Sequence, residues 1–228
     1  EVTDDLHFTT DGKGFVLTSE QNGWNHIHYV PMGGTPKAIT SGNWDVLEVK
    51  GIDEKGRRVI FTASRNAPQQ QEVWAVGLDG RGLRELSPKG GFNDAEFSTG
   101  FRFFINTRST LNTVPVITLH EGSGKLVKTL KDNARLQKTA AEYGLVEREF
   151  FSLTTEGGVA LNGWMLKPPG FQSSQRYPVF MAQYSGPNSN EVKDSWSGRN
   201  PLWYSLLARK GYVVVCVDGR CTGRRGRD

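Results

Sequence analysis

Short runs of alternating hydrophobic and polar residues fill the first two-thirds of the chain, and glycine-containing turns separate them. This alternation, with a period of two residues, predicts short β-strands that each bury one face. The same order of one turn and three strands occurs three times. The predicted strands are 15–18, 26–30 and 37–40 in the first group, 58–62, 72–76 and 83–86 in the second, and 101–106, 114–119 and 125–130 in the third.

The three groups repeat at a constant spacing. The turn glycines Gly12, Gly56 and Gly100 are 44 residues apart, which lies within the period of about 40–50 residues that propeller blades show. Blades stack around an axis because one blade cannot bury both of its faces, and a propeller has about 4–8 of them. We therefore expect the last blades of a larger β-propeller, with the other blades upstream or in a partner. A β-sandwich with a coincidental spacing is the alternative.

The pattern changes after about residue 132. Residues 133–144 predict a short helix, which Gly144 ends. Two strands joined by a glycine turn follow, then a short apolar strand, a helix, and a β-branched strand expected to be buried on both faces. An antiparallel start followed by parallel strands with a crossover helix is typical of an α/β-hydrolase sheet. The five elements are expected at 147–153, 159–166, 179–182, 201–209 and 212–217, and the helix carries Leu202, Trp203, Leu206 and Leu207 on one side.

Charge and hydropathy exclude two classes of protein. The formal net charge is +4 over 228 residues, but Arg220, Arg224, Arg225 and Arg227 gather at the end of the chain. A nucleic-acid-binding surface needs basic residues spread over a face, so we expect no nucleic-acid partner. No apolar run of about 18 residues occurs, so we expect no membrane segment, and the acidic first residues lack the pattern of a signal peptide.

Histidine, cysteine and tryptophan residues are better explained by packing than by a binding site. His26 and His28 share one face of a predicted strand, but the sequence offers no third metal ligand nearby. Cys216 lies in a hydrophobic run and Cys221 follows five positions later, which forms neither a disulfide framework nor a zinc motif. The tryptophans recur at blade-like positions, as packing residues would: Trp24, Trp44 and Trp74.

Four segments carry a resemblance to a known family. Two lie in the second part of the chain, YPVFMAQYSGP at 177–187 and GYVVVCVDGR at 211–220. Two lie in the predicted blades, GWNHI at 23–27 and ITSGNWDV at 39–46. Together they resemble the prolyl oligopeptidase clan of serine peptidases, and most closely the dipeptidyl peptidase IV family, from about His7 onward.

The resemblance implies a role for Tyr184, on the loop after the third hydrolase strand. There its phenol would donate to the oxyanion that forms when a serine attacks a peptide carbonyl, without adding a charge. A tyrosine packed at the strand end is the alternative. Gly186 and Pro187 would shape the turn. Asp218 would belong to a turn with local charge pairing, and Cys221 stands where the family has glycine, which costs stability if that position needs a positive φ.

The resemblance also implies an activity for the parent protein. It would be a serine exopeptidase that releases N-terminal dipeptides, Xaa-Pro or Xaa-Ala, from peptide substrates, with no cofactor and no metal. The chain contains no Gly-x-Ser-x-Gly, so we expect the catalytic triad after residue 228, the amine-binding glutamates before residue 1, and no activity in this chain alone. A homodimer of the parent stays open, and the family favours a periplasmic, secreted or membrane-tethered location.

The predicted fold is therefore mixed, with three parts. Residues 1–132 are expected to form the last blades of an all-β propeller, residues 133–146 a linker, and residues 147–228 the first strands of an α/β-hydrolase domain. Two other functions stay open on the sequence. One is a non-catalytic β-propeller binding module, and the other is a sibling enzyme of the same clan, such as an acylaminoacyl peptidase.

Overall fold

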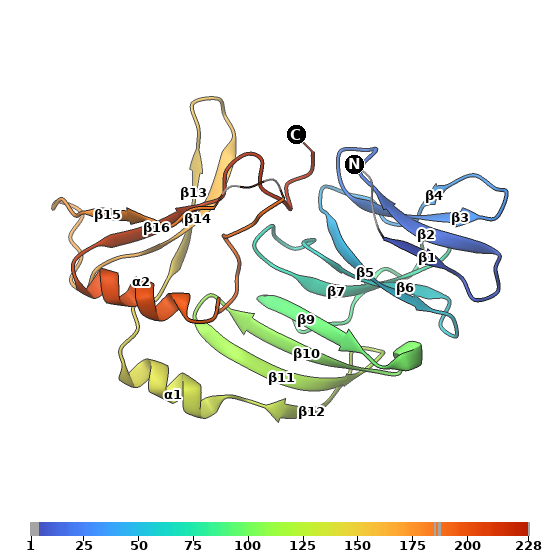
Figure 1. The fold of residues 1–228 in the computed structure, drawn as a ribbon, viewed down its shortest axis with the longest axis horizontal. Coiled ribbons are helices and arrows are strands. Elements are labelled where there is room, and N and C mark those ends of the chain that lie inside the picture. Colours follow the sequence, from blue (N-terminus) through green and yellow to red (C-terminus); the bar gives the residue numbers. More distant parts are fainter. Residues whose placement is uncertain (1–4, 185, 187, 228) are drawn as a thin grey trace. The chain divides into compact units, whose positions relative to one another are not determined.

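The computed structural model describes residues 5–184, 186 and 188–227, and they form two compact units. Unit 1 comprises the chain up to Arg108, residues Val116–Lys131 and the segment from Arg224 onward. Unit 2 comprises Ser109–Pro115 and Asp132–Gly223. Each unit has a hydrophobic core of its own, and β-strands predominate (Figure 1).

The strands of unit 1 belong to three four-stranded sheets whose neighbouring strands follow one another along the chain, and the ends of β10 and β11 within Ser109–Pro115 are counted in unit 2. These sheets confirm the predicted all-β repeat, and their architecture is that of propeller blades. The first sheet holds β1 (Leu6–Phe8), β2 (Gly14–Ser19), β3 (His26–Pro31) and β4 (Lys37–Ala38), the second β5 (Val46–Asp53), β6 (Arg58–Ala63), β7 (Glu72–Gly77) and β8 (Arg84–Glu85), and the third β9 (Phe92–Phe97), β10 (Phe103–Thr110), β11 (Thr113–Glu121) and β12 (Leu126–Lys131).

The sequence pattern missed the first strand of every sheet, namely β1, β5 and β9. In β5 the pairing register shifts twice, between Val46 and Glu48 and between Val49 and Gly51, where Gly51 has a φ of 135°. Such a bulge moves the following side chains to the other face, so the hydrophobic alternation loses its period of two. The last strands, β4 and β8, have two residues each and are shorter than expected.

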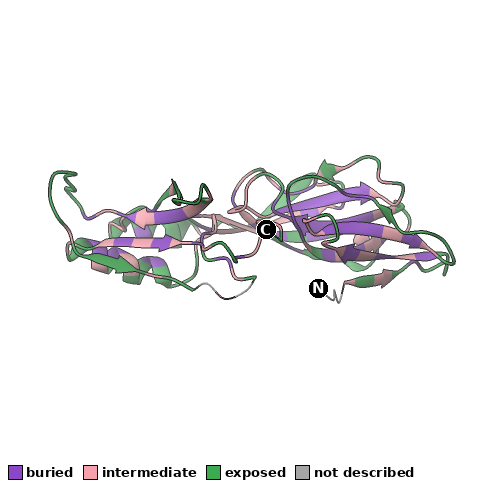
Figure 2. Cartoon of the chain, turned by 90° about the horizontal axis from the view of Figure 1, so that it is seen from above, coloured by how far each residue is buried: buried purple, intermediate pink, exposed green. Residues whose placement is uncertain are grey.

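The second sheet of unit 1 is covered on both faces. On β6, Val59 and Phe61 belong to a core shared with the first sheet, whereas Ile60 belongs to a core shared with the third. All three side chains are fully buried. Buried stretches, coloured purple, run along several strands of unit 1 in Figure 2. Successive residues of a strand point to opposite faces, so one strand closes two interfaces. Burying each of these side chains stabilises the stack by about 1.5–3 kcal/mol.

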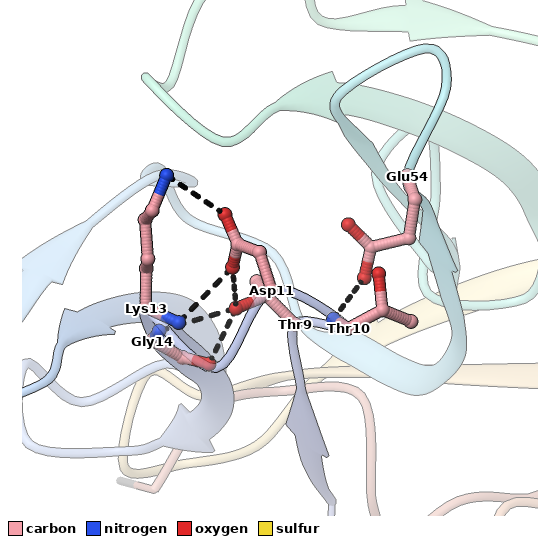
Figure 3. A network of polar contacts seen from close by, with 6 residues as sticks. All are labelled: Thr9, Thr10, Asp11, Lys13, Gly14 and Glu54. Carbon is pink, nitrogen blue, oxygen red and sulfur yellow. Dashed lines mark hydrogen bonds and ion pairs between the residues drawn. The ribbon is translucent and has the colours of Figure 1, made fainter.

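Equivalent turns of the first two sheets are joined by a hydrogen bond (Figure 3). Asp11 Oδ1 accepts hydrogen bonds from the Thr9 hydroxyl, at 2.8 Å, and from the Lys13 amide, at 3.0 Å. The Lys13 amide and the Thr9 hydroxyl, in that order, lower the pKa of Asp11. The Thr10 amide then donates to Glu54 Oε1 at 2.7 Å. Thr10 and Glu54 are 44 residues apart, so the repeat spacing brings equivalent turns of adjacent blades together.

Unit 2 contains one mixed four-stranded sheet in the order β13-β14-β16-β15. β14 pairs antiparallel with β13 and β16, whereas β15 and β16 are parallel and are connected through α2. This order of elements agrees with the sequence prediction, with ends that differ by a few residues. The elements are α1 (Ala134–Glu142), β13 (Glu149–Thr154), β14 (Ala160–Leu166), β15 (Val179–Met181), α2 (Asn200–Arg209) and β16 (Val213–Val217).

One burial prediction for unit 2 is wrong, that for β16, and α2 buries a face that the sequence analysis did not single out. α2 turns the small residues Pro201, Ser205 and Ala208 into the protein, because positions i, i+4 and i+7 share one helix face and small side chains let the backbone approach. Its large side chains at Leu202, Trp203 and Leu206 are about half exposed, at 51%, 53% and 48%. β16 alternates between buried and partly exposed residues instead of being buried on both faces. In the part of the chain that the structure describes, no helix is both long and apolar enough to cross a membrane.

A buried arginine holds several segments of unit 2 together. The Arg148 guanidinium is within the core and donates through Nη2 to the carbonyl oxygens of Leu111, Ser195 and Trp196. It lies over the Trp164 ring, 5.8 Å from the centroid. Burial lowers the pKa of Arg148 to about 10, so the side chain keeps its charge at neutral pH.

Candidate active site at the ends of β15 and β16

Two polar side chains follow the parallel strands of unit 2. Tyr184 comes three residues after the end of β15, and Asp218 follows β16 directly. Parallel strands end at the same edge of their sheet, and this edge is where α/β sheets bind ligands. The Tyr184 side chain is exposed, at 65%, whereas Asp218 is buried, at 3%. One group therefore faces solvent while the other lies inside the protein.

The loop that carries Tyr184 is held by short local contacts. A Cβ atom on Gly186 would lie 2.9 Å from the Tyr184 hydroxyl oxygen, so a side chain at position 186 would displace the phenol. The Ser189 hydroxyl contacts the carbonyl oxygens of Gly186, at 2.6 Å, and of Tyr184, at 3.3 Å. Gly186 thus provides space for the phenol. Ser185 and Pro187, which the sequence motif includes, lie outside the described residues.

The Asp218 carboxylate accepts three hydrogen bonds from the same loop. The donors are the Asn190 side-chain amide and the backbone amides of Glu191, at 2.9 Å, and Val192, at 3.1 Å. A turn does follow Asp218, because the Thr222 hydroxyl donates to the Gly219 carbonyl at 2.7 Å. The predicted local charge pairing is wrong, because the partners of the Asp218 carboxylate are amides about 27 residues away in sequence.

The segment after Asp218 also packs against the Tyr184 loop. The Gly223 amide donates to the Ser189 carbonyl at 2.8 Å, and a Cβ atom on Gly223 would lie 2.9 Å from the Asn188 carbonyl oxygen. Cys221 is exposed and is not among the residues with a positive φ, whereas Arg224 has a φ of 69°. A cysteine at position 221 therefore causes no backbone strain of the kind that the sequence led us to consider.

The second cysteine is buried beside this site. Burial, and then the nearby Asp218 and Glu191 charges, raise the pKa of the Cys216 thiol to about 12. A thiol with such a pKa is neutral at physiological pH and is a poor nucleophile. Cys216 packs in the core of unit 2 with Trp164 and Val214, as the sequence predicts for a small buried hydrophobic residue.

The histidines and tryptophans of unit 1 take part in packing. The His26 ring contacts the Thr40 hydroxyl at 3.1 Å and the Gly42 carbonyl at 2.9 Å, and burial lowers its pKa. His28 contacts Gln21 at 3.0 Å. Among the described residues, no cluster of three or more side chains suited to a metal ion occurs. Trp44 and Trp74 lie in the core of unit 1, and the Arg65 guanidinium lies over both rings.

Comparisons with known proteins identify the family. The family described as "Dipeptidyl peptidase IV (DPP IV) N-terminal region" matches residues 1–115. The crystal structure of Porphyromonas gingivalis dipeptidyl peptidase 4 is 40% identical with a TM-score of 0.90, over 98% of this chain and 31% of that protein. A probable dipeptidyl peptidase 4 of Arthroderma benhamiae is 30% identical over 93% of this chain and 28% of its own length. A probable dipeptidyl-aminopeptidase B of Aspergillus fumigatus is 32% identical over 94% of this chain and 24% of its own length.

The chain thus spans less than a third of the length of each of these relatives. The family match covers half of the chain, from the first sheet through the second and on to the first two strands of the third. The relatives and the P. gingivalis structure extend the similarity through unit 2, which contains Tyr184 and Asp218. The chain therefore belongs to the dipeptidyl peptidase IV family.

Proposed function

We propose that this chain is part of a serine dipeptidyl peptidase. Residues 1–132 supply the last blades of its propeller, residues 133–146 form a linker, and residues 147–228 form the first part of its α/β-hydrolase domain. The strand order of unit 2 supports the last assignment, because an antiparallel hairpin precedes a parallel pair connected by a helix. The similarity to dipeptidyl peptidases over nearly the whole chain supports the reaction class.

The exposed phenol of Tyr184 is the observation that carries the mechanism. A serine that attacks a peptide carbonyl leaves negative charge on the carbonyl oxygen, and a donor already aimed at that oxygen lowers the barrier. Tyr184 has a solvent-exposed side chain at the carboxyl-terminal edge of parallel strands. In our proposal its hydroxyl donates one of the two hydrogen bonds to the oxyanion, and a backbone amide next to the serine donates the other.

The substrates of this proposal are peptides with proline or alanine at the second position, from which the parent enzyme releases an N-terminal dipeptide. The serine, its base and the orienting carboxylate come from sequence after residue 228, and the groups that bind the substrate's amine come from sequence before residue 1. The chain alone is then inactive. The coverage of less than a third of each relative is consistent with this division.

The test is Tyr184→Phe in the full-length parent protein, with hydrolysis of a Gly-Pro amide as the assay. Loss of one oxyanion donor should lower kcat by about 10²–10³-fold with the fold intact. The 228-residue chain, assayed in parallel, should release no product. An unchanged kcat would remove Tyr184 from the mechanism. A downstream coding sequence without a Gly-x-Ser-x-Gly motif would favour a non-catalytic propeller module instead.

A further inference from the structure

We infer that Asp218 is the positioning residue of the Tyr184 loop, an inference that rests on the proposed function. The Asp218 side chain lies in the protein interior and accepts hydrogen bonds from three consecutive residues, Asn190, Glu191 and Val192. These residues begin six positions after Tyr184. One carboxylate at the end of β16 therefore fixes the far end of the loop that follows β15.

Further hydrogen bonds link this anchor to Tyr184 itself. Ser189 precedes Asn190, and its hydroxyl contacts the backbone carbonyls of Tyr184 and Gly186. The amide of Gly223 donates to the Ser189 carbonyl at 2.8 Å. The start of the loop is held as well, because the Ala182 amide donates to the β16 strand at 2.8 Å. Hydrogen bonds therefore hold the chain at Ala182, before Tyr184, and at Ser189, after it.

The chemistry of the anchor requires a carboxylate. Its two oxygens accept three N–H groups, and hydrogen bonds to an ionised acceptor are about twice as strong as those between neutral groups. In Asp218→Asn, one oxygen becomes an NH₂ group, which can only donate. Whichever way the amide is turned, it then faces an N–H of Glu191 or Val192, so at least one hydrogen bond is replaced by a donor–donor contact.

A loosened loop should lower catalysis through the phenol. Oxyanion donors work when they are held within about 0.5 Å of the productive geometry, and a displacement of about 1 Å can reduce the rate about 100-fold. Asp218 is buried, binds the loop at residues 190–192, and does not touch the reacting atoms in our proposal. Its effect on kcat should therefore depend on the Tyr184 hydroxyl, whereas a general loss of folding would not.

The experiment is a double-mutant cycle in the full-length parent protein, with Gly-Pro amide hydrolysis at saturating and limiting substrate. We expect Asp218→Asn to lower kcat by about 10–100-fold and to change KM by less than about 3-fold. In the Tyr184→Phe background, the same substitution should lower kcat by less than about 3-fold, since the hydroxyl it positions is absent. Where Tyr184→Phe lowers kcat as proposed, an unchanged kcat in Asp218→Asn, or losses that multiply in the double variant, would overturn the inference.

Ser205→Ala is the matched control. The Ser205 hydroxyl is also buried in unit 2 and accepts a hydrogen bond from the Val146 amide at 2.9 Å, but this bond lies on α2 and not on the Tyr184 loop. The variant loses one buried hydrogen bond and should keep kcat within about 2-fold. If Asp218→Asn does not fold, Asn190→Ala removes a single contact and should lower kcat by about 3–10-fold.

Hydrogen exchange separates this inference from the proposed function. In the parent protein, Asp218→Asn should speed exchange of the amides of Glu191, Val192 and the loop from 183 to 190 by about 10-fold or more, with no such change in Ser205→Ala. If Tyr184→Phe keeps full activity but the loop exchanges faster in Asp218→Asn, the proposed mechanism fails while Asp218 still positions the loop. Unchanged exchange in Asp218→Asn would refute the positioning role, whatever the kinetics.

Discussion

The buried Arg148 guanidinium provides a sharp test of how unit 2 is held together. Its Nη2 group donates to three carbonyl oxygens, and the side chain is buried against the Trp164 ring. Arg148→Met fills much of the same volume and removes the donors. Each carbonyl left without its partner costs about 1–3 kcal/mol when water cannot reach it. We expect a loss of about 3 kcal/mol, because relaxation rescues part of the sum.

The assay is urea unfolding of the 228-residue chain, followed by tryptophan fluorescence and circular dichroism. With an m-value of about 1.5 kcal/mol per M, the midpoint for unit 2 should fall by about 2 M. Arg209→Met is the matched control. Arg209 also donates to a carbonyl oxygen, that of Gly144, but it is exposed. Its loss should cost less than about 1 kcal/mol, because water replaces the donor.

Equal losses in the two arginine variants would refute this reasoning, since burial would then make no difference. Arg148→Lys should lie between the wild type and Arg148→Met, because an ammonium keeps the charge and its N–H donors, but the lysine side chain ends one bond short of the position of Nη2. A lysine variant less stable than the methionine variant would indicate that the buried charge, rather than the lost donors, dominates the free energy of unfolding.

Two further predictions concern titratable groups, namely the buried Glu72 and the two cysteines. Burial raises the pKa of Glu72, and its Oε1 has no hydrogen-bond partner among the described residues. The Glu72 carboxyl therefore keeps its proton to a higher pH in the folded state than in the unfolded state. As a result, the free energy of unfolding falls as the pH rises above about 4.5. Glu72→Gln should thus gain about 1–3 kcal/mol over the wild type in urea titrations at pH 8, and an equal gain at pH 4.5 would contradict this. The exposed Cys221 should react with a thiol reagent in the native protein, whereas Cys216, which is buried and has a pKa of about 12, should react only after unfolding. An absorbance assay that counts two reactive thiols in the native protein would refute this prediction.

The sequence by itself determined the local elements of this protein. Alternation with a period of two depends only on neighbouring residues, so strands such as β2, β6 and β14 were predicted close to their observed ends. The 44-residue spacing predicted stacked blades, and in the structure equivalent turns of adjacent sheets are in contact through Thr10 and Glu54. Tyr184 was found through a family resemblance, and its exposed position could not be read from the pattern.

The tertiary structure decided which faces and polar groups are buried. α2 buries its small face and not its large apolar one, because the close approach of the helix to the sheet favours small side chains. The partners of Arg148 and Asp218 lie about 30 to 50 residues away along the chain. A buried polar group is stable only when distant segments bring it the right donors and acceptors. No local pattern contains that information, so these anchors emerged only from the folded chain.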